Sequence, residues 1–199
     1  MPYVTVAKAH AREETVKGSS FIAFVTPVQS VDDALTKLNE VRTEHEGATH
    51  NPFAYRVGPE MRFSDDGEPG GTAGRPLLEV LQKRGVDFVL AVVTRYYGGT
   101  KLGAGGLVRS YSGSLARVLD EAGVVTVRET VTRAVSVPFS DMDAVHRLLG
   151  AWAGLRKGEA AYSAAGLELN VTLYADDETF LADALTEATR GEAVMRTPS

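Results

Sequence analysis

The chain has 199 residues, contains no cysteine, and carries a formal net charge of -5. The lack of cysteine excludes disulfides, thiolate nucleophiles and cysteine-rich metal sites. The N-terminus lacks a secretory pattern and no run approaches the roughly 20 apolar residues of a membrane span, so we expect a cytoplasmic protein with no membrane partner. Hydrophobic residues make up 44% of the chain and charged residues 24%, as in folded globular proteins, and the length favours two domains.

The first part of the chain is predicted to be α+β. Apolar residues at 31, 34, 35, 38 and 41 share one helical face, which predicts an amphipathic helix. Two further helices are expected to end before Gly85 and Gly123, because glycine accepts the left-handed conformation of a helix end. These helices span residues 77–84 and 107–122, and strands rich in β-branched or aromatic residues are expected at 21–25, 53–57 and 88–93.

The second part is predicted to follow the βαββαβ order of a ferredoxin-like unit. Its expected elements span residues 132–138, 141–152, 159–163, 167–174, 178–190 and 193–196. We therefore expect two domains, residues 1–130 and 131–199. The first contains 15 basic and 16 acidic residues and the second 6 and 10, so the net acidity lies mainly in the second.

A glycine-rich segment, residues 96–106, joins a predicted strand to a predicted helix. Glycine lets the backbone approach a ligand closely, and a helix N-terminus attracts anions. The nucleotide-binding fingerprints are absent, because Ala104 replaces the Walker lysine and Val108 the last small residue of the dinucleotide motif. The alternative is that the glycines only allow a strand and a helix to pack closely. The glycines concerned are Gly98, Gly99, Gly103, Gly105 and Gly106.

The stretch from Phe88 to Leu119 contains no acidic residue. We predict that its cations Arg95, Lys101 and Arg109 contact phosphates, and that Tyr96 or Tyr97 stacks on a base. Arg109 falls in the first turn of a helix, where its charge opposes the helix dipole unless an anion binds there. Arg117 lies a turn or more away and is expected to contribute less.

An acidic and glycine-rich segment, residues 64–76, carries Asp65, Asp66 and Glu68. Three carboxylates could hold a hard cation such as magnesium, although their spacing does not match a calcium loop. The alternative is a turn in which Thr72 caps the helix behind Pro76 and the acids pair with Arg75 or Arg95. We assign no metal and no cofactor. We expect this segment to lie beside the glycine-rich segment.

His50 is the only histidine in a distinctive context, at the entry to a predicted strand. One histidine cannot form a zinc site, and capping or hydrogen bonding in the core is the alternative. A metal-dependent hydrolase, dipeptidase-like or acting on phosphate esters, would have only His50, Asp65, Asp66 and Glu68, so we assign no catalytic residue; a protein-interaction module is a third possibility. The expected rim of the binding site consists of Lys17, His50, Tyr55, Arg56, Asp65, Asp66, Glu68, Thr72 and Arg75.

These motifs, in this order, resemble those of the Impact family. The resemblance rests on residues 17–23, 48–51, 54–56, 64–76, 93–99 and 101–109. Residues from about 132 onward resemble the small C-terminal domain of two-domain bacterial members. The resemblance implies a first domain like domain IV of elongation factor G, of the ribosomal-protein domain 2-like kind, and a ferredoxin-like second domain like its domain V. It implies a translation-associated factor that binds RNA or the ribosome and could regulate translation.

The sequence departs from the family at one place. The family often has a second histidine and then a cysteine after the position of His50, whereas this chain has Asn51 and Pro52. A mechanism that needs a thiol or a histidine pair there is therefore not expected.

Overall fold

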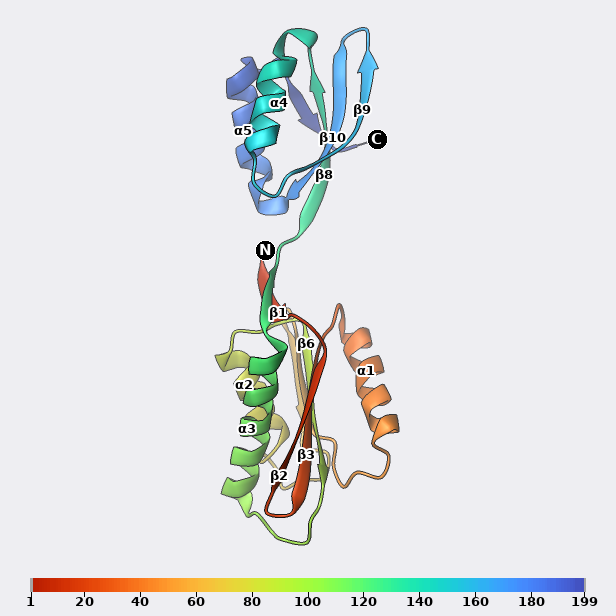
Figure 1. The fold of residues 1–199 in the computed structure, drawn as a ribbon, viewed down its shortest axis with the longest axis vertical. Helices are drawn as coiled ribbons and strands as arrows, with labels where there is room; N and C mark the ends of the chain where they lie inside the picture. The colour runs from red at the N-terminus through yellow and green to blue at the C-terminus, as the bar shows by residue number, and fades with distance from the viewer. Residues whose placement is uncertain (1, 199) are drawn as a thin grey trace. The chain divides into compact units, whose positions relative to one another are not determined.

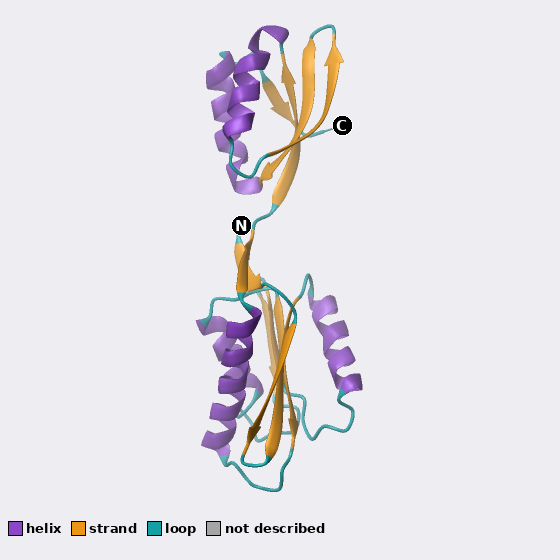
Figure 2. Ribbon diagram, viewed as in Figure 1, coloured by secondary structure: helices purple, strands orange, loops and turns teal. Residues whose placement is uncertain are grey.

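The computed structural model describes residues 2–198, which form two compact units, Tyr3–Val127 and residues 128–198. Both units are mixed α/β: each contains an antiparallel sheet with helices packed on it (Figure 2). We call them the N-terminal unit and the C-terminal unit.

A five-stranded antiparallel sheet forms the centre of the N-terminal unit, with strand order β2-β3-β6-β4-β5. The central strands β3 and β6 pair from Ser20 opposite Tyr96 to Pro27 opposite Val89. The strands are β2 (His10–Val16), β3 (Ser19–Pro27), β4 (Phe53–Val57), β5 (Glu60–Ser64) and β6 (Val89–Tyr96).

Three helices cover this sheet: α1 (Val31–Glu44) on one face, and α2 (Gly74–Lys83) and α3 (Ala104–Ala122) on the other (Figure 1). The predicted ends of two helices are confirmed, since Gly85 and Gly123 follow α2 and α3 with φ of +64° and +68°. At the start of α1, the side chain of Ser30 accepts a hydrogen bond from the Asp33 N–H at 3.1 Å. None of the helices in residues 2–198 is long and apolar enough to cross a membrane.

The N-terminal unit buries apolar side chains on both faces of its sheet. The core below α2 and α3 contains Phe21, Leu77, Leu115 and Tyr111. The core below α1 is separate and smaller, and includes Leu38 and Leu90 among others. Successive residues of a strand point to opposite faces, so a central strand with a core on each side is apolar throughout, as residues 89–93 of β6 are.

Four strands of the N-terminal unit were not predicted. Two are the edge strands β2 and β5, whose side chains are half-buried or exposed. The other two, β1 (Tyr3–Val6) and β7 (Val124–Val127), pair with each other as a separate two-stranded ladder. The edge strands β2 and β5 bury little side-chain area, so their sequences lack the apolar pattern by which central strands are recognised. The strands β1 (Tyr-Val-Thr-Val) and β7 (Val-Val-Thr-Val) are rich in β-branched residues but are only four residues long.

The C-terminal unit contains the predicted series of strand, helix, strand, strand, helix, strand. Its four strands form an antiparallel sheet in the order β11-β8-β10-β9. The helices α4 and α5 pack on one face of it (Figure 1), where Val135 and Val171 of the sheet and Leu181 of α5 belong to one core. Two short 3-10 turns, η1 (Phe139–Asp141) and η2 (Ala175–Asp177), precede the helices. The elements are β8 (Thr130–Val137), α4 (Met142–Ala151), β9 (Arg156–Ser163), β10 (Gly166–Tyr174), α5 (Glu178–Thr189) and β11 (Val194–Arg196).

Candidate functional site

The acidic and glycine-rich segment, residues 64–76, which we call the acid–glycine loop, folds around the carboxylate of Asp65. Its oxygens accept hydrogen bonds from the backbone N–H groups of Gly71, Ala73 and Gly74 at 2.8, 3.0 and 2.8 Å. The last two N–H groups belong to the start of α2, which otherwise has no side-chain cap. Asp65 therefore satisfies the free donors at this helix end from outside the helix.

The prediction that Thr72 caps α2 is wrong. Its hydroxyl donates to the Pro69 carbonyl oxygen at 2.6 Å, inside the loop. The helix begins at Gly74, which lies so close to Ser64 that a Cβ there would be 2.4 Å from the Ser64 carbonyl oxygen. The local sequence contains the usual capping residue, but the loop closes on itself and a carboxylate from its other end takes the capping position.

Asp66 and His50 hold the loop to the sheet. The Asp66 carboxylate accepts from the Asn51 N–H at 2.7 Å and from Arg42 at 3.2 Å. The Nδ1 atom of His50 lies 2.8 Å from the Asp66 carbonyl oxygen. Asn51, where the family often has a second histidine, accepts from the Thr94 hydroxyl at 2.7 Å. These contacts favour the alternative in which His50 forms a hydrogen bond within the fold.

The third acid of the loop, Glu68, is buried and bonded to two side chains. Its Oε1 accepts from Arg95 at 2.7 Å and from the Tyr111 hydroxyl at 2.6 Å. The Arg95 guanidinium also donates to the Ser19 hydroxyl at 3.3 Å and lies 5.4 Å from the centroids of the Phe21 and Tyr97 rings. Burial raises the pKa of the Tyr111 hydroxyl, and the hydrogen bond to Glu68 raises it further.

Arg95 is therefore not the surface phosphate contact that the sequence predicts. Its side chain is only 6% exposed and forms an ion pair with Glu68. A phosphate would have to displace this buried carboxylate, which would leave a charge buried without its partner. The pairing of an acid from the loop with Arg95 is one of the predicted alternatives and is confirmed. Arg75 instead forms an exposed ion pair with Glu79, at 3.2 Å.

The three acids bond to separate partners rather than converging on one point. Asp65 accepts from backbone donors, Asp66 from Asn51 and Arg42, and Glu68 from Arg95 and Tyr111. Within residues 2–198 no group of three His, Asp or Glu side chains has the geometry to hold a metal ion. The set His50, Asp65, Asp66 and Glu68, considered for a metal-dependent hydrolase, is engaged in holding the loop.

The segment from Tyr96 to Gly106, which we call the glycine-rich loop, uses its glycines in two ways. Gly98 serves close packing, because a Cβ there would lie 1.9 Å from the Gly18 carbonyl oxygen, and its N–H donates to Ser19 at 3.2 Å. Gly99 and Gly103 have φ of +84° and +74° with no atom within 4 Å of an added Cβ. Gly103 leads into α3, whose first turn has no side-chain cap. The close-packing alternative therefore applies to Gly98, while the ligand-binding interpretation of the other glycines stays a prediction.

Three exposed cations surround this helix end: Lys17 in the turn between β2 and β3, Lys101 in the glycine-rich loop, and Arg109 in α3. Among the described residues none of the three forms an ion pair or a side-chain hydrogen bond. The Arg109 guanidinium turns back along the helix, with one nitrogen 3.5 Å from the position of a Cβ on Gly105. Lys17 and Arg109 line one hollow of about 290 Å³ together with Val16, Leu102, Gly106, Ser110 and Arg117.

Arg117 lines the same hollow but is already paired. Its guanidinium donates to Glu14 of β2, which also accepts from Ser114. Burial alone would raise the pKa of Glu14, but the hydrogen bonds from Arg117 and Ser114 outweigh it and the pKa is lowered. The sequence placed Arg117 outside the site for its distance along the helix, whereas the structure places it at the edge with its charge compensated.

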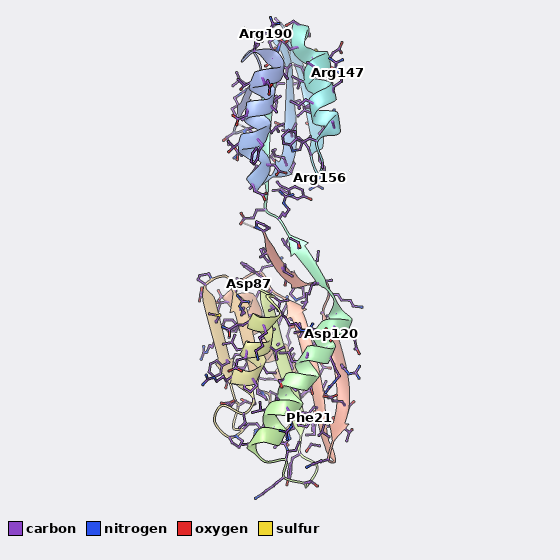
Figure 3. All side chains as sticks on the ribbon, turned by 90° about the vertical axis from the view of Figure 1, so that its left-hand side faces the viewer. Phe21, Asp87, Asp120, Arg147, Arg156 and Arg190 are labelled. Carbon is purple, nitrogen blue, oxygen red and sulfur yellow. The ribbon has the colours of Figure 1, made fainter. Side chains whose placement is uncertain are left out.

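The two loops meet, as predicted. A second hollow of about 340 Å³ is lined by Glu68 and Pro69 of the acid–glycine loop and, from the other segments, by Arg95, Tyr97, Lys101, Leu102, Gly103, Ala104 and Leu107. Leu102 lines this hollow and the basic one. Phe21, a residue of β3 labelled in Figure 3, packs below α3, with its ring centroid 5.2 Å from that of Tyr111.

Three other predicted residues lie away from this helix end. Tyr55 packs in the core below α1. Arg56 donates to the Val86 carbonyl oxygen at 2.7 Å and lies 3.9 Å from Asp87. The Tyr96 hydroxyl lies 3.1 Å from Nδ1 of His45, on the α1 side of the sheet. Of the two tyrosines considered for stacking, only Tyr97, 45% exposed, borders the hollow between the loops.

Tyr111 and Ser19 were not predicted from the sequence as partners of the buried ion pair. Tyr111 falls on the apolar face of α3, which predicts a core residue, and its ring does pack in the core. Its hydroxyl has the additional role of donating to Glu68. Nothing in the sequence distinguishes Ser19 from other strand residues. It comes near Arg95 only because β3 pairs with β6. A buried Glu and a buried Arg require donors and acceptors around them, but which side chains supply them depends on the tertiary fold.

The N-terminal unit is thus a mixed α/β fold in which the uncapped start of α3 is surrounded by exposed cations. Beside it lies the acid–glycine loop, whose carboxylates hold it in place. The model of the Impact N-terminal domain matches residues 17–119, which include both loops. An IMPACT family member of Thermus thermophilus, from the pol 5′ region, is 41% identical over 177 residues, 88% of this chain and 96% of that protein. YigZ of Escherichia coli is 38% identical over 144 residues, 69% of this chain and 70% of YigZ.

The chain belongs to the IMPACT family. A crystal structure of a hypothetical protein is similar over the whole length, with 30% identity, a TM-score of 0.66, and coverage of 100% of this chain and 98% of the other.

Proposed function

We propose that this protein is a translation-associated factor of the cytoplasm that binds RNA, as free RNA or within the ribosome, through the N-terminal end of α3. The observation that supports this most is the gathering of Lys17, Lys101 and Arg109, exposed and without partners among the described residues, around an uncapped helix N-terminus. Free N–H groups and unpaired cations together suit the phosphates of a nucleic-acid backbone. This helix end lies within a 32-residue stretch of the sequence without acids, Phe88 to Leu119.

The fold comparison with translation factors belongs to the same proposal. The strand and helix order of the C-terminal unit and its sheet order, β11-β8-β10-β9, support a ferredoxin-like domain. The N-terminal unit is proposed to resemble domain IV of elongation factor G, as the family resemblance implies. We further propose that the two units are independent domains, because each has its own core.

The C-terminal unit is a poorer candidate for RNA contact. Three of its arginines are bonded to carboxylates: Arg128 to Asp176 and Asp177, Arg133 to Glu178, and Arg196 to Glu168. Arg147, Arg156 and Arg190, labelled in Figure 3, come from three different places in the chain: α4, β9 and the end of α5. The sheet face turned away from its helices carries mainly polar side chains on β8 and β10, among them Thr132, Ser136, Glu168, Asn170 and Thr172. The aromatic residue of β10 on this face, Tyr174, has the Arg128 guanidinium 3.8 Å from its ring centroid, and base stacking needs a free aromatic face.

The test is RNA binding by the whole protein across several salt concentrations, with a structured ribosomal RNA fragment as the probe. In the triple variant Lys17→Ala, Lys101→Ala and Arg109→Ala we expect weaker binding and a salt slope smaller by about one unit per lost phosphate contact. The matched control replaces Lys8, Arg62 and Lys83 by Ala, three exposed cations elsewhere on the N-terminal unit, also without partners among the described residues. Equal loss in both triple variants, or no binding by wild type, contradicts the proposal.

A further inference from the structure

The hollow between the two loops has features that a packing gap does not need. Its apolar wall consists of Pro69, Leu102, Ala104 and Leu107, and its aromatic wall is Tyr97. Lys101 stands at its border without a partner among the described residues. At about 340 Å³ it lies at the lower end of the range for small-molecule sites, about 300–1,000 Å³. It is suited to a single flat group rather than to a double helix.

One carboxylate oxygen in this hollow has no donor among the described residues. Glu68 lines the hollow with a side chain only 3% exposed, and both of its hydrogen bonds, from Arg95 and Tyr111, end on Oε1. The other oxygen, Oε2, accepts no hydrogen bond from the described residues. Unlike Nε of Arg95, it is not sealed from solvent. A charged carboxylate oxygen that is open to the hollow can accept a hydrogen bond from a ligand N–H group, and hydrogen bonds to charged acceptors are among the stronger ones.

The other end of the hollow suits a negative charge. Gly103 and Ala104, at the start of α3, form part of its lining, and no side chain caps this helix end. The free N–H groups of the first turn and the ammonium of Lys101 both attract a phosphate oxygen. The hollow therefore combines an acceptor at its base, apolar and aromatic walls, and an anion site at its border. A nucleotide has groups that match these features: a base whose amino group donates hydrogen bonds, the flat face of that base, and a phosphate.

We propose that this hollow binds one unstacked base of single-stranded RNA, and that it prefers a base with an exocyclic amino group, such as cytosine or adenine. The base lies against Tyr97, its amino group donates to Oε2 of Glu68, and its phosphate contacts Lys101 and the start of α3. Uracil and hypoxanthine present a carbonyl oxygen where cytosine and adenine present the amino group, and this oxygen would face the carboxylate. The inference rests on the proposed RNA binding and adds a base preference to it.

The first test varies the ligand and leaves the protein intact. Fluorescence anisotropy at pH 7.5 compares eight-residue oligonucleotides of cytidine with those of uridine, and of adenosine with those of inosine. We expect the amino-bearing member of each pair to bind at least about tenfold more tightly, since a hydrogen bond to a charged acceptor is gained and a repulsive contact avoided. Equal affinity within both pairs overturns the base site while leaving RNA binding in place. Binding of none of the four overturns both proposals.

The second test varies the protein. Glu68→Gln replaces one carboxylate oxygen by an NH₂ group, so we expect the preference to move from cytidine toward uridine. An unchanged preference in a folded variant overturns the role of Glu68. Because this variant could fail to fold, Tyr97→Ala supplies a second test on a half-exposed side chain: we expect it to weaken binding of the cytidine oligonucleotide by at least about tenfold. Tyr162→Ala, an exposed tyrosine of the C-terminal unit, is the matched control. Equal effects of the two tyrosine substitutions contradict the proposal.

Discussion

The acid–glycine loop and the glycine-rich loop have similar sequences, rich in glycine and charge, and the structure uses their charges in opposite ways. Every carboxylate of the first loop is bonded: Asp65 to the start of α2, Asp66 to Asn51 and Arg42, and Glu68 to Arg95 and Tyr111. In the second loop Lys101, and in the helix after it Arg109, have no partner among the described residues. Charged side chains that stabilise a fold form hydrogen bonds or ion pairs within it, whereas charged side chains that bind a ligand are exposed in the free protein.

Apart from the base preference assigned to Glu68, this contrast predicts that substitutions in the two loops affect different properties. Removing an acid should lower the free energy of unfolding of the N-terminal unit. Removing a cation should lower RNA affinity and leave stability nearly unchanged. The single tryptophan, Trp152, packs in the core of the C-terminal unit, so its fluorescence follows that unit separately, while amide hydrogen exchange follows the N-terminal unit.

The largest expected effect is that of Glu68→Ala. It leaves the Arg95 guanidinium, 6% exposed, without its carboxylate, and breaking a buried pair from one side costs about 3–5 kcal/mol. Hydrogen exchange of β3 and β6 should accelerate strongly, while the urea midpoint of Trp152 fluorescence stays unchanged. Glu44→Ala, at an exposed position of α1, is the control and should change little. A loss below about 1 kcal/mol for Glu68→Ala would show that the pair contributes little to the fold.

A smaller effect is expected for Asp65→Ala. The substitution removes the acceptor for the Ala73 and Gly74 N–H groups, and loss of a cap costs about 0.5–2 kcal/mol. Thr72→Ala is the informative comparison, because Thr72 bonds to Pro69 and not to the helix. Hydrogen exchange in α2 should therefore accelerate more in the Asp65 variant. The reverse order would restore Thr72 as the cap.

Arg117→Ala tests a charge that is bonded although it lies at the basic hollow. Loss of this partner should cost less than about 1 kcal/mol at pH 7, because Arg117 is 47% exposed. The pKa of Glu14 is lowered in the folded protein: burial raises it, and the hydrogen bonds from Arg117 and Ser114 lower it by more. A lowered pKa stabilises the fold above the ordinary Glu pKa, about 4.3, and this contribution is lost as the pH falls through the folded value.

The difference between wild type and Arg117→Ala should therefore be full at pH 7 and should disappear in acid, once Glu14 is protonated in both proteins. Denaturation at a series of pH values measures it, with Glu14→Gln as the control that removes the pH dependence. A difference that grows as the pH falls would contradict the assignment.

The smallest effect on stability is expected for Arg109→Ala. Among the described residues this side chain has no partner. The sequence placed Arg109 in the first turn of its helix, which is wrong: α3 begins at Ala104 and Arg109 is its sixth residue, so its charge opposes the helix dipole only weakly. Stability should therefore be unchanged or slightly higher, while RNA affinity falls. Marked destabilisation would place Arg109 with the bonded charges and remove the contrast between the loops.

The sequence predicted most of the central elements and fewer of the contacts. Periodicity and glycine placed α1, α2, α3, β4 and β6 well, because these segments bury apolar faces. It could not place β2 and β5 at the sheet edges. Sequence reasoning placed the two loops side by side but assigned Arg95 to the surface. A cation beside glycines has the same sequence pattern whether it is exposed or paired with an acid from a distant segment. Lys101 and Arg109 were predicted from the absence of nearby acids, which is a property of the sequence itself.

The most direct test of the RNA-binding surface is an amide NMR titration of the whole protein with the ribosomal RNA fragment. We predict that the largest chemical-shift changes fall on Lys17, residues 97–110 and the adjoining Glu68 and Pro69, with small changes on α1 and on the C-terminal unit. Changes centred on the C-terminal unit or on α1, with residues 97–110 unaffected, would contradict the account.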